Sequence, residues 1–112
     1  MKPAFLRGEV YWTRLDPVVG REQAKSRPCV ILSDTAINQR RATVVIVPLT
    51  QTPQPEQLPL VVALVSMGVR TKARTEHIRS VDKTRLGRLE GALSDDDMDK
   101  LGAAVAKVLK LG

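Results

Sequence analysis

The first third of the chain places a charged loop between two runs that predict β-strands. Val10 and Trp12 share one face of the run from Glu9 to Leu15, the alternation expected of a half-buried strand. The run from Pro28 to Leu32 is continuously apolar, as expected of a buried central strand. Between the two runs, Asp16-Pro17 indicates a loop. A charged loop held by strands is a common place for binding and catalytic residues.

Further short apolar runs predict more strands along the chain. Thr43 to Leu49 is rich in valine and isoleucine and predicts a second buried strand. The segment from Asp34 to Ala42 is expected to hold a short helical turn, and the proline-rich segment from Gln51 to Pro59 a stiff, exposed loop. The remaining predictions are strands at Leu60 to Leu64, Ala73 to Val81 and Arg85 to Leu93, with a bend at Ser66 to Lys72.

The end of the chain carries the clearest helical pattern. Ser94 and Asp97 have capping-box spacing, and three successive aspartates lie where the helix dipole favours negative charge. These aspartates lack the residue order and the bidentate glutamate of a calcium loop. An apolar stripe of helical period follows at Met98, Leu101, Val105, Val108 and Leu109. Short strands and one terminal helix predict a mainly β fold, a small SH3-like curled sheet with the helix packed on it.

Charge and composition narrow the classes of function. The 112 residues are expected to form one domain, 1–112, and 18 Lys and Arg against 12 Asp and Glu leave a net charge of +6. That balance favours a polyanionic partner, with nucleic acid ahead of an anionic membrane. The sequence contains neither an apolar run long enough to span a bilayer nor a secretory signal. We therefore expect a soluble cytoplasmic protein.

Cysteine and aromatic residues are few. The single cysteine, Cys29, lies among apolar residues and is expected to behave as a small buried hydrophobe. One Phe, one Tyr and one Trp are too few for a base-stacking platform. Tyr11 and Trp12 are adjacent in a predicted strand, so they face opposite ways. We expect one of them in the core and the other on a surface that stacks a base or packs on a partner.

Several common chemistries do not fit the residues present. One histidine and one cysteine cannot build a closed zinc site, and the sequence has neither a nucleophile elbow nor a glycine-rich phosphate loop. Arginine, glutamate and threonine remain, and no cofactor is expected. These residue types suffice for cleavage of RNA by its own 2′-hydroxyl, because the protein need only remove a proton and stabilise charge on the phosphate.

Four positions are candidates for that chemistry. Arg27 is held in an extended backbone by the proline that follows it, and it binds a phosphate or forms a surface ion pair with a nearby acid, Glu22 or Asp34. The hydroxyl of Thr50, at the end of an apolar run, can donate to a phosphate.

The other two positions, Arg74 and Glu76, lie two apart in a predicted strand and so share a face. They form either a general base with a phosphate clamp or an exposed salt bridge. His77 is expected on the opposite face of that strand, away from the pair, and therefore in a non-catalytic role.

Several segments, in order, resemble the MazF/PemK/Kid family of toxin endoribonucleases. They are RGEVYW from Arg7, the loop LDPVVGREQ, the Arg-Pro pair before an apolar strand, PLT at the end of the third strand and EHIRSVDKTRL from Glu76. The resemblance extends to Leu109 and implies a CcdB/PemK-type β-barrel that forms a homodimer. It also implies metal-independent cleavage of single-stranded RNA, with mRNA as the expected target, at a short preferred sequence to give 2′,3′-cyclic phosphate and 5′-hydroxyl ends. The resemblance further implies that the toxin inhibits translation and that an acidic MazE/PemI-like antitoxin neutralises it. The toxin would bind DNA only indirectly, through that antitoxin.

The resemblance also suggests roles for individual residues. Arg27 and Thr50 match catalytic positions of the family, and Arg74 and Glu76 fall where one branch places its acid and its base. Glu22 matches a loop carboxylate that other members use, so the general base is either Glu76 or Glu22.

Contacts to RNA are expected at Arg21, Lys25, Gln51, Thr52 and Thr71. Arg21 stands where Kid-like members have a histidine, and Lys25-Ser26 replace a spacer that contains glycine, so the cleavage sequence stays open. The alternative function is a non-catalytic basic SH3-like module that binds RNA or an acidic protein segment.

Overall fold

The computed structural model describes residues 4–15, 26–68 and 70–111. Within these residues the chain forms strands, two α-helices and two short 3₁₀ helices. In order they are β1 (Glu9–Arg14), β2 (Ser26–Ile31), α1 (Thr35–Arg40), β3 (Thr43–Thr50), β4 (Val61–Ala63), β5 (Lys72–Arg74), η1 (Thr75–His77), β6 (Arg79–Asp82), η2 (Lys83–Arg85), β7 (Leu86–Ala92) and α2 (Asp95–Leu109).

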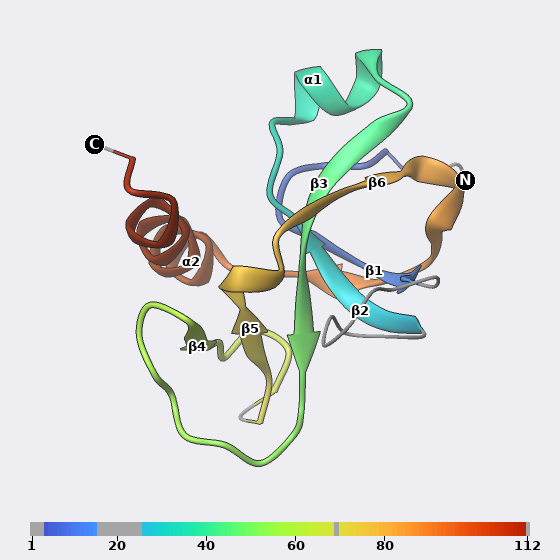
Figure 1. Cartoon of the computed structure of the whole chain (residues 1–112). Helices are drawn as coiled ribbons and strands as arrows, with labels where there is room; N and C mark the ends of the chain where they lie inside the picture. Colours follow the sequence, from blue (N-terminus) through green and yellow to red (C-terminus); the bar gives the residue numbers. More distant parts are fainter. Residues whose placement is uncertain (1–3, 16–25, 69, 112) are drawn as a thin grey trace.

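The strands form one antiparallel sheet with β3 at its centre. The order is β4-β5-β3-β2-β1-β7, and β6 pairs with the first half of β3. In Figure 1, β3 runs from the α1 end of the molecule to the long loop that precedes β4. The mainly β fold with a C-terminal helix is confirmed. Among the described residues the pairing path is open, so backbone hydrogen bonds do not close it into the barrel that we expected.

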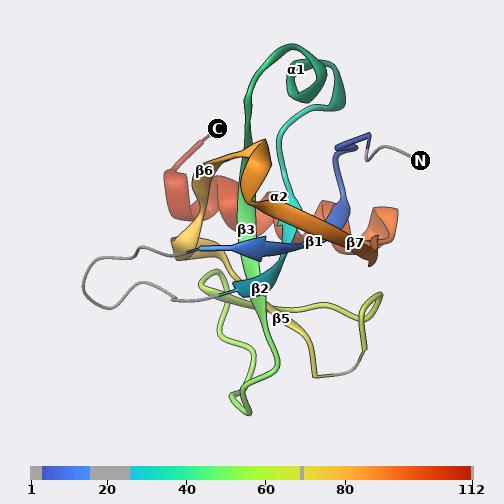
Figure 2. The same ribbon diagram turned by 90° about the vertical axis from the view of Figure 1, so that its right-hand side faces the viewer.

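Both faces of the central strands are buried, which explains their continuous apolar runs. On one face, Val30 and Val47 belong to a core that includes residues of α2. On the other face, Cys29, Ile31 and Ile46 belong to a second core. Figure 2, turned by 90°, shows α2 behind the sheet, with α1 beyond one end of β3.

β1 separates the two adjacent aromatic residues. Tyr11 is fully buried, whereas Trp12 is 44% exposed, so the prediction of one core and one surface aromatic is confirmed. Val10 and Trp12 share a face of β1, and their register partners on β2 are Val30 and Pro28. Of the two β1 residues, only Val10 belongs to the core that includes α2. The same strand face therefore continues from the core to an open surface.

The C-terminal helix begins as predicted. The side chain of Ser94 accepts a hydrogen bond from the backbone N–H of Asp97 at 3.1 Å. Leu101 is fully buried and Val105 nearly so, in the core shared with the sheet. Neither described helix combines the length and apolarity that a membrane crossing requires.

The single strand predicted over Ala73 to Val81 is wrong. β5 ends at Arg74, η1 follows, and β6 begins at Arg79. The reason is Thr75, which is fully buried and whose hydroxyl donates to the Pro59 carbonyl at 2.6 Å. This hydrogen bond across the fold turns the chain, so that β5 and β6 pair with different parts of β3.

Cys29 is fully buried in the second core, as predicted. Burial raises the pKa of its thiol to about 12. The thiol therefore stays protonated at neutral pH and is a poor nucleophile.

Candidate active site

The candidate site lies where two central strands part. The last registered pair of β2 and β3 is Cys29 with Pro48. Beyond that pair β2 stays with β1, since Arg27 lies opposite Thr13. β3 stays with β5, since Thr50 lies opposite Lys72. The sheet thus forks into two arms at this end.

Two prolines accompany the fork. Pro28 lies on β2 and Pro48 on β3, next to the point where the pairing stops. A proline has no backbone N–H to donate, and it is rarely found between two paired strands. The positions of these prolines therefore account for the loss of pairing.

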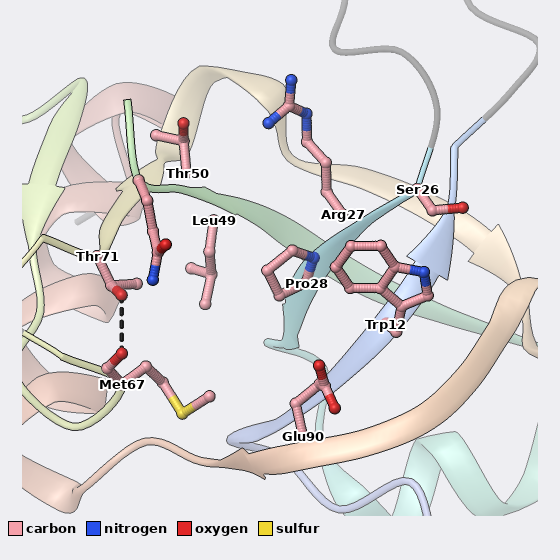
Figure 3. A pocket seen from close by; sticks show the side chains of 10 residues that line it. Trp12, Ser26, Arg27, Pro28, Leu49, Thr50, Met67, Thr71 and Glu90 are labelled. Carbon is pink, nitrogen blue, oxygen red and sulfur yellow. Dashed lines mark hydrogen bonds between the residues drawn. The ribbon is translucent and has the colours of Figure 1, made fainter. Parts of the chain in front are cut away.

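A pocket of about 390 Å³ lies in the fork, and we call it the fork pocket (Figure 3). Its volume is within the range of small-molecule and cofactor sites, about 300–1,000 Å³. Its lining comes from both arms of the fork, from the loop between β4 and β5, and from β7. The lining residues are Trp12, Ser26, Arg27, Pro28, Leu49, Thr50, Gln51, Met67, Thr71 and Glu90.

The two charges of the fork pocket lie at opposite ends. Among the lining residues that the structure describes, Arg27 is the only cation and Glu90 the only anion. Figure 3 shows Arg27 and Thr50 at one end of the pocket, with Met67 and Glu90 at the other. An anionic group is therefore favoured at the Arg27 end, whereas the Glu90 carboxylate, which accepts from Arg88 at 2.8 Å, favours a hydrogen-bond donor at its end.

Arg27 has unused hydrogen-bonding capacity. Its Nε is buried and has no hydrogen-bond partner among the described residues. The alternative ion pair with Asp34 is not formed, because the Asp34 side chain caps α1 and accepts from the Ala36 N–H at 3.1 Å. A buried donor without a partner costs free energy, and a phosphate or carboxylate ligand would relieve that cost.

Thr50 lies beside Arg27 as the last residue of β3. It is 3% exposed, and its hydroxyl donates to the Thr52 hydroxyl at 2.9 Å. The same Thr50 oxygen accepts from the Thr52 N–H at 3.2 Å. The predicted RNA contact Thr52 therefore holds Thr50 in place, and Gln51 between them is exposed at the edge of the pocket.

The wall formed by the loop between β4 and β5 is held locally. The hydroxyl of Thr71 donates to the Met67 carbonyl at 2.9 Å. Met67 in turn packs on Gly91 of β7, where a Cβ atom would lie only 3.1 Å from the Met67 sulfur. A side chain at Gly91 would therefore displace Met67 from the pocket wall.

The same wall is anchored to the start of α2 by Asp97. This buried carboxylate accepts from the Val65 N–H at 3.0 Å, from the Ser66 N–H at 2.8 Å and from the Ser66 hydroxyl. It therefore binds the turn after β4 and does not complete a reciprocal capping box with Ser94. Burial alone would raise the pKa of Asp97, but the hydrogen bonds from Ser66 and Val65 outweigh it and the pKa is lowered.

Next to the fork lies a second charged group, which we call the η1 cluster: Arg74, Glu76 and His77. Nη2 of Arg74 is 3.7 Å from Oε1 of Glu76 and 3.5 Å from Nε2 of His77. The expected proximity of Arg74 and Glu76 is confirmed, but it comes from a 3₁₀ turn and not from a shared strand face. The prediction that His77 faces away is wrong, because residues three apart eclipse one another in 3₁₀ geometry.

The η1 cluster is a neighbour of the fork pocket and not part of its lining. Thr50 lies opposite Lys72, and Arg74 is two residues further along β5. Thr50 and Arg74 thus share one face of this arm as diagonal neighbours, for which Cα atoms are about 7–8 Å apart. A phosphate held at the Arg27 and Thr50 end would lie close to the cluster.

The structure brings together four of the predicted site residues in one pocket: Arg27, Thr50, Gln51 and Thr71. The remaining predicted residues of the loop before β2, Arg21, Glu22 and Lys25, lie outside the described residues. Among the described residues, no group of three or more His, Cys, Asp or Glu side chains is arranged to hold a metal ion.

Sequence reasoning missed Met67 and Glu90 as pocket residues. Glu90 gave no signal, because it lies on an edge strand whose residues 87–90 are all exposed. For Met67 the sequence did hold a signal, Gly91, since a glycine inside a strand often marks the close approach of another segment. Here that segment is the one that carries Met67.

The sequence and the fold of this chain are both similar to those of known toxins and endoribonucleases. Residues 6–109 match the family of PemK-like, MazF-like toxins of type II toxin-antitoxin systems. The chain is 32% identical over 109 residues to the endoribonuclease EndoA of Bacillus subtilis (strain 168), covering 94% of each chain. A mycobacterial endoribonuclease solved with its cognate antitoxin superposes with a TM-score of 0.79 at 29% identity, covering 99% of this chain and 98% of the other. MazF from Deinococcus radiodurans shares the fold, with a TM-score of 0.84 at 23% identity over 98% of this chain and 100% of that one.

Proposed function

Because the chain belongs to the PemK-like, MazF-like toxin family of type II toxin–antitoxin systems, we propose that it is an endoribonuclease toxin. It cleaves single-stranded RNA, with mRNA as its target in the cytoplasm, and thereby inhibits translation. An acidic antitoxin neutralises it, in line with the antitoxin complex of the mycobacterial relative. The active form is a homodimer. The net charge of +6 on each chain favours association with RNA.

The reaction uses the 2′-hydroxyl of the substrate as the nucleophile and needs no metal ion. A general base takes the proton from the 2′-hydroxyl, the O2′–P bond forms and the P–O5′ bond breaks. The leaving 5′-oxygen takes up a proton from solvent. The products are a 2′,3′-cyclic phosphate and a 5′-hydroxyl. These ends differ from the 3′-hydroxyl and 5′-phosphate that remain when water attacks the phosphate and the P–O3′ bond breaks.

The observation that carries the proposal is the unpartnered Nε of Arg27 at one end of the fork pocket. A guanidinium can hold two phosphoryl oxygens at once and stabilise the charge that develops on them. Thr50, buried beside it on the adjacent arm of the fork, can turn the hydroxyl hydrogen that it donates to Thr52 toward a bound phosphate. The scissile phosphate is therefore proposed to bind between Arg27 and Thr50.

Proton removal is assigned to the neighbouring η1 cluster. Glu76 is ion-paired with Arg74 at 3.7 Å, and its side chain is 44% exposed, so it is accessible to a substrate hydroxyl. A carboxylate in this position can serve as the general base. Glu22, in the loop before β2, is the other candidate for this role.

The test is cleavage of a long single-stranded RNA in the presence of EDTA, followed by analysis of the end groups. We expect 5′-hydroxyl and 2′,3′-cyclic phosphate ends, and no cut where the 2′-hydroxyl at the scissile position is replaced by hydrogen. Cleavage of that deoxy-substituted position would contradict the mechanism. Intact RNA with salt-sensitive binding would instead indicate a non-catalytic RNA-binding module.

A further inference from the structure

The fork pocket contains more than the proposed chemistry requires. Arg27 and Thr50 occupy only one end of it. The rest extends between apolar side chains toward the carboxylate of Glu90, which points into the pocket from β7 (Figure 3). The apolar lining consists of Trp12, Pro28, Leu49 and Met67.

We propose that this part of the pocket holds one nucleobase of the RNA, stacked on Trp12 and read by Glu90. Glu90 favours a base with an exocyclic amino group, that is adenine, cytosine or guanine, over uracil. The inference rests on the proposed endoribonuclease function, because the phosphate held by Arg27 places the RNA at the mouth of the pocket. It adds a site for recognition of one base and a preference at that position.

Trp12 has the exposure and the fixed position that stacking requires. Its side chain is 44% exposed and lines the pocket, whereas its neighbours Tyr11 and Thr13 are fully buried. The buried neighbours hold the strand, so the indole ring is presented without a large loss of backbone freedom on binding. Unstacked bases of single-stranded RNA commonly pack on such rings.

Glu90 is positioned before any ligand binds. Arg88, two residues earlier on β7, donates from Nε to Glu90 Oε2 at 2.8 Å and from Nη2 to Oε1 at 3.4 Å. A carboxylate has about four lone-pair sites, so it can still accept hydrogen bonds from a ligand. An ionised carboxylate only accepts, so it favours a base whose amino group donates to it. Uracil is disfavoured because its one ring donor, N3–H, is flanked by two carbonyl oxygens that the carboxylate repels.

The charge distribution favours a base over a second phosphate in this part of the pocket. A phosphate there would meet the Glu90 carboxylate, which Arg88 already pairs and which offers the phosphate no hydrogen-bond donor. Arg27, the only cation among the described lining residues, lies at the far end. An acidic peptide side chain is disfavoured for the same reason. A base is uncharged, fits between apolar walls and offers amino hydrogens to the carboxylate.

The first experiment uses Trp12 as its own reporter, because it is the only tryptophan in the chain. The wild-type protein is titrated with an RNA oligonucleotide that spans a mapped cleavage site and carries 2′-deoxy at the scissile position. Matched oligonucleotides replace single cytosines or adenines by uracil. We expect a change of tryptophan fluorescence on binding, weakened about tenfold in affinity by uracil at one position next to the scissile phosphate.

The second experiment compares Glu90→Gln with the wild type in cleavage of the same sequences. The glutamine amide both donates and accepts, so we expect the discrimination against uracil at that position to fall about tenfold. Glu56→Gln is the matched control, since Glu56 is also ion-paired, with Lys100 at 2.7 Å, but does not line the pocket. It should keep the wild-type preference.

Two results would overturn the inference. One is a wild type that binds the oligonucleotide with no change in Trp12 fluorescence. The other is a folded Glu90→Gln variant, checked by circular dichroism, that cleaves the same positions with the same discrimination as the wild type. Failure of the proposed function looks different, because the wild-type protein would then cleave no RNA and no cleavage site could be mapped. The titration would in that case use oligo-A, oligo-C and oligo-U, and equal responses of Trp12 fluorescence to all three would overturn the inference as well.

Discussion

The fork pocket and the η1 cluster each carry an arginine, but the two arginines have different surroundings. The Nε atom of each is buried without a partner. Nη2 of Arg74 is nevertheless in contact with Glu76 and His77, whereas Arg27 has no charged partner among the described residues. The pocket is therefore open to an anion, while the cluster already balances part of its own charge.

This difference separates binding from proton transfer. A site with an unpaired guanidinium gains most from holding a phosphate, and its loss should affect both substrate affinity and the rate. A preformed arginine–carboxylate pair suits a general base, and removal of that carboxylate should lower kcat and leave KM nearly unchanged. Variants in the two regions should thus have different kinetic signatures.

Glu76→Gln should have the largest effect. Removal of a general base lowers kcat by about 10²–10⁴-fold, and KM should change little because the phosphate contacts remain. The measurement is steady-state cleavage of a short RNA that contains one mapped site, with Glu56→Gln as the control of equal charge. Activity close to the wild type in Glu76→Gln would transfer the base role to Glu22 and leave the η1 cluster as a surface ion pair.

Arg27→Ala should follow, with a loss of about 2.7–4 kcal/mol in transition-state stabilisation, the cost of removing one oxyanion donor. Here KM should rise as well, and the slope of log affinity against log salt should decrease by about 0.7 for the lost phosphate contact. The control is Arg40→Ala, which removes an exposed arginine at the end of α1. An equal loss of activity in both variants would show that overall charge, and not the pocket, governs the rate.

Asp97→Asn tests the support of the pocket wall and should reduce the free energy of unfolding by about 2 kcal/mol, since charged hydrogen bonds are lost. The lowered pKa of Asp97 means that its contribution is complete above the unfolded pKa of about 3.9 and is lost as the pH falls below it. The difference from the wild type should therefore be present at pH 7 and shrink at pH 3. Urea unfolding at both values measures it, and Asp96→Asn, exposed on the same turn, is the control.

Thr50→Val should give the smallest effect, up to about tenfold in kcat/KM, because it removes one neutral hydrogen-bond donor while keeping the shape of the side chain. Thr50→Ser should restore most of the activity. A loss in the serine variant as large as in the valine variant would mean that packing, and not the hydroxyl, matters at this position.

Much of the fold follows from local patterns. The buried strands were predictable because valine and isoleucine dominate them, and α2 was predictable from its cap and its apolar stripe. η1 was not, because the turn depends on a hydrogen bond from Thr75 to Pro59, sixteen residues away. A hydrogen bond across the fold leaves no periodic signal in the sequence, and this is why the side of the strand assigned to His77 was wrong.

The candidate site was predictable only in part. Arg27 and Thr50 are marked by their places at strand ends, next to proline or to a proline-rich segment. Glu90 and Met67 enter the pocket through the pairing of β7 with β1, which has two irregularities of register, and through the packing of Met67 on Gly91. Neither arrangement is visible without the three-dimensional structure.

The anchoring of the pocket wall by Asp97 has a consequence for synthesis of the protein. The turn at Val65 and Ser66 is held by a carboxylate that lies about thirty residues later in the chain. A nascent chain on the ribosome cannot make these hydrogen bonds until α2 has emerged from the exit tunnel. The wall of the fork pocket is therefore completed only near the end of translation, and a polypeptide terminated before α2 would be expected to be inert toward the messages of the cell that makes it.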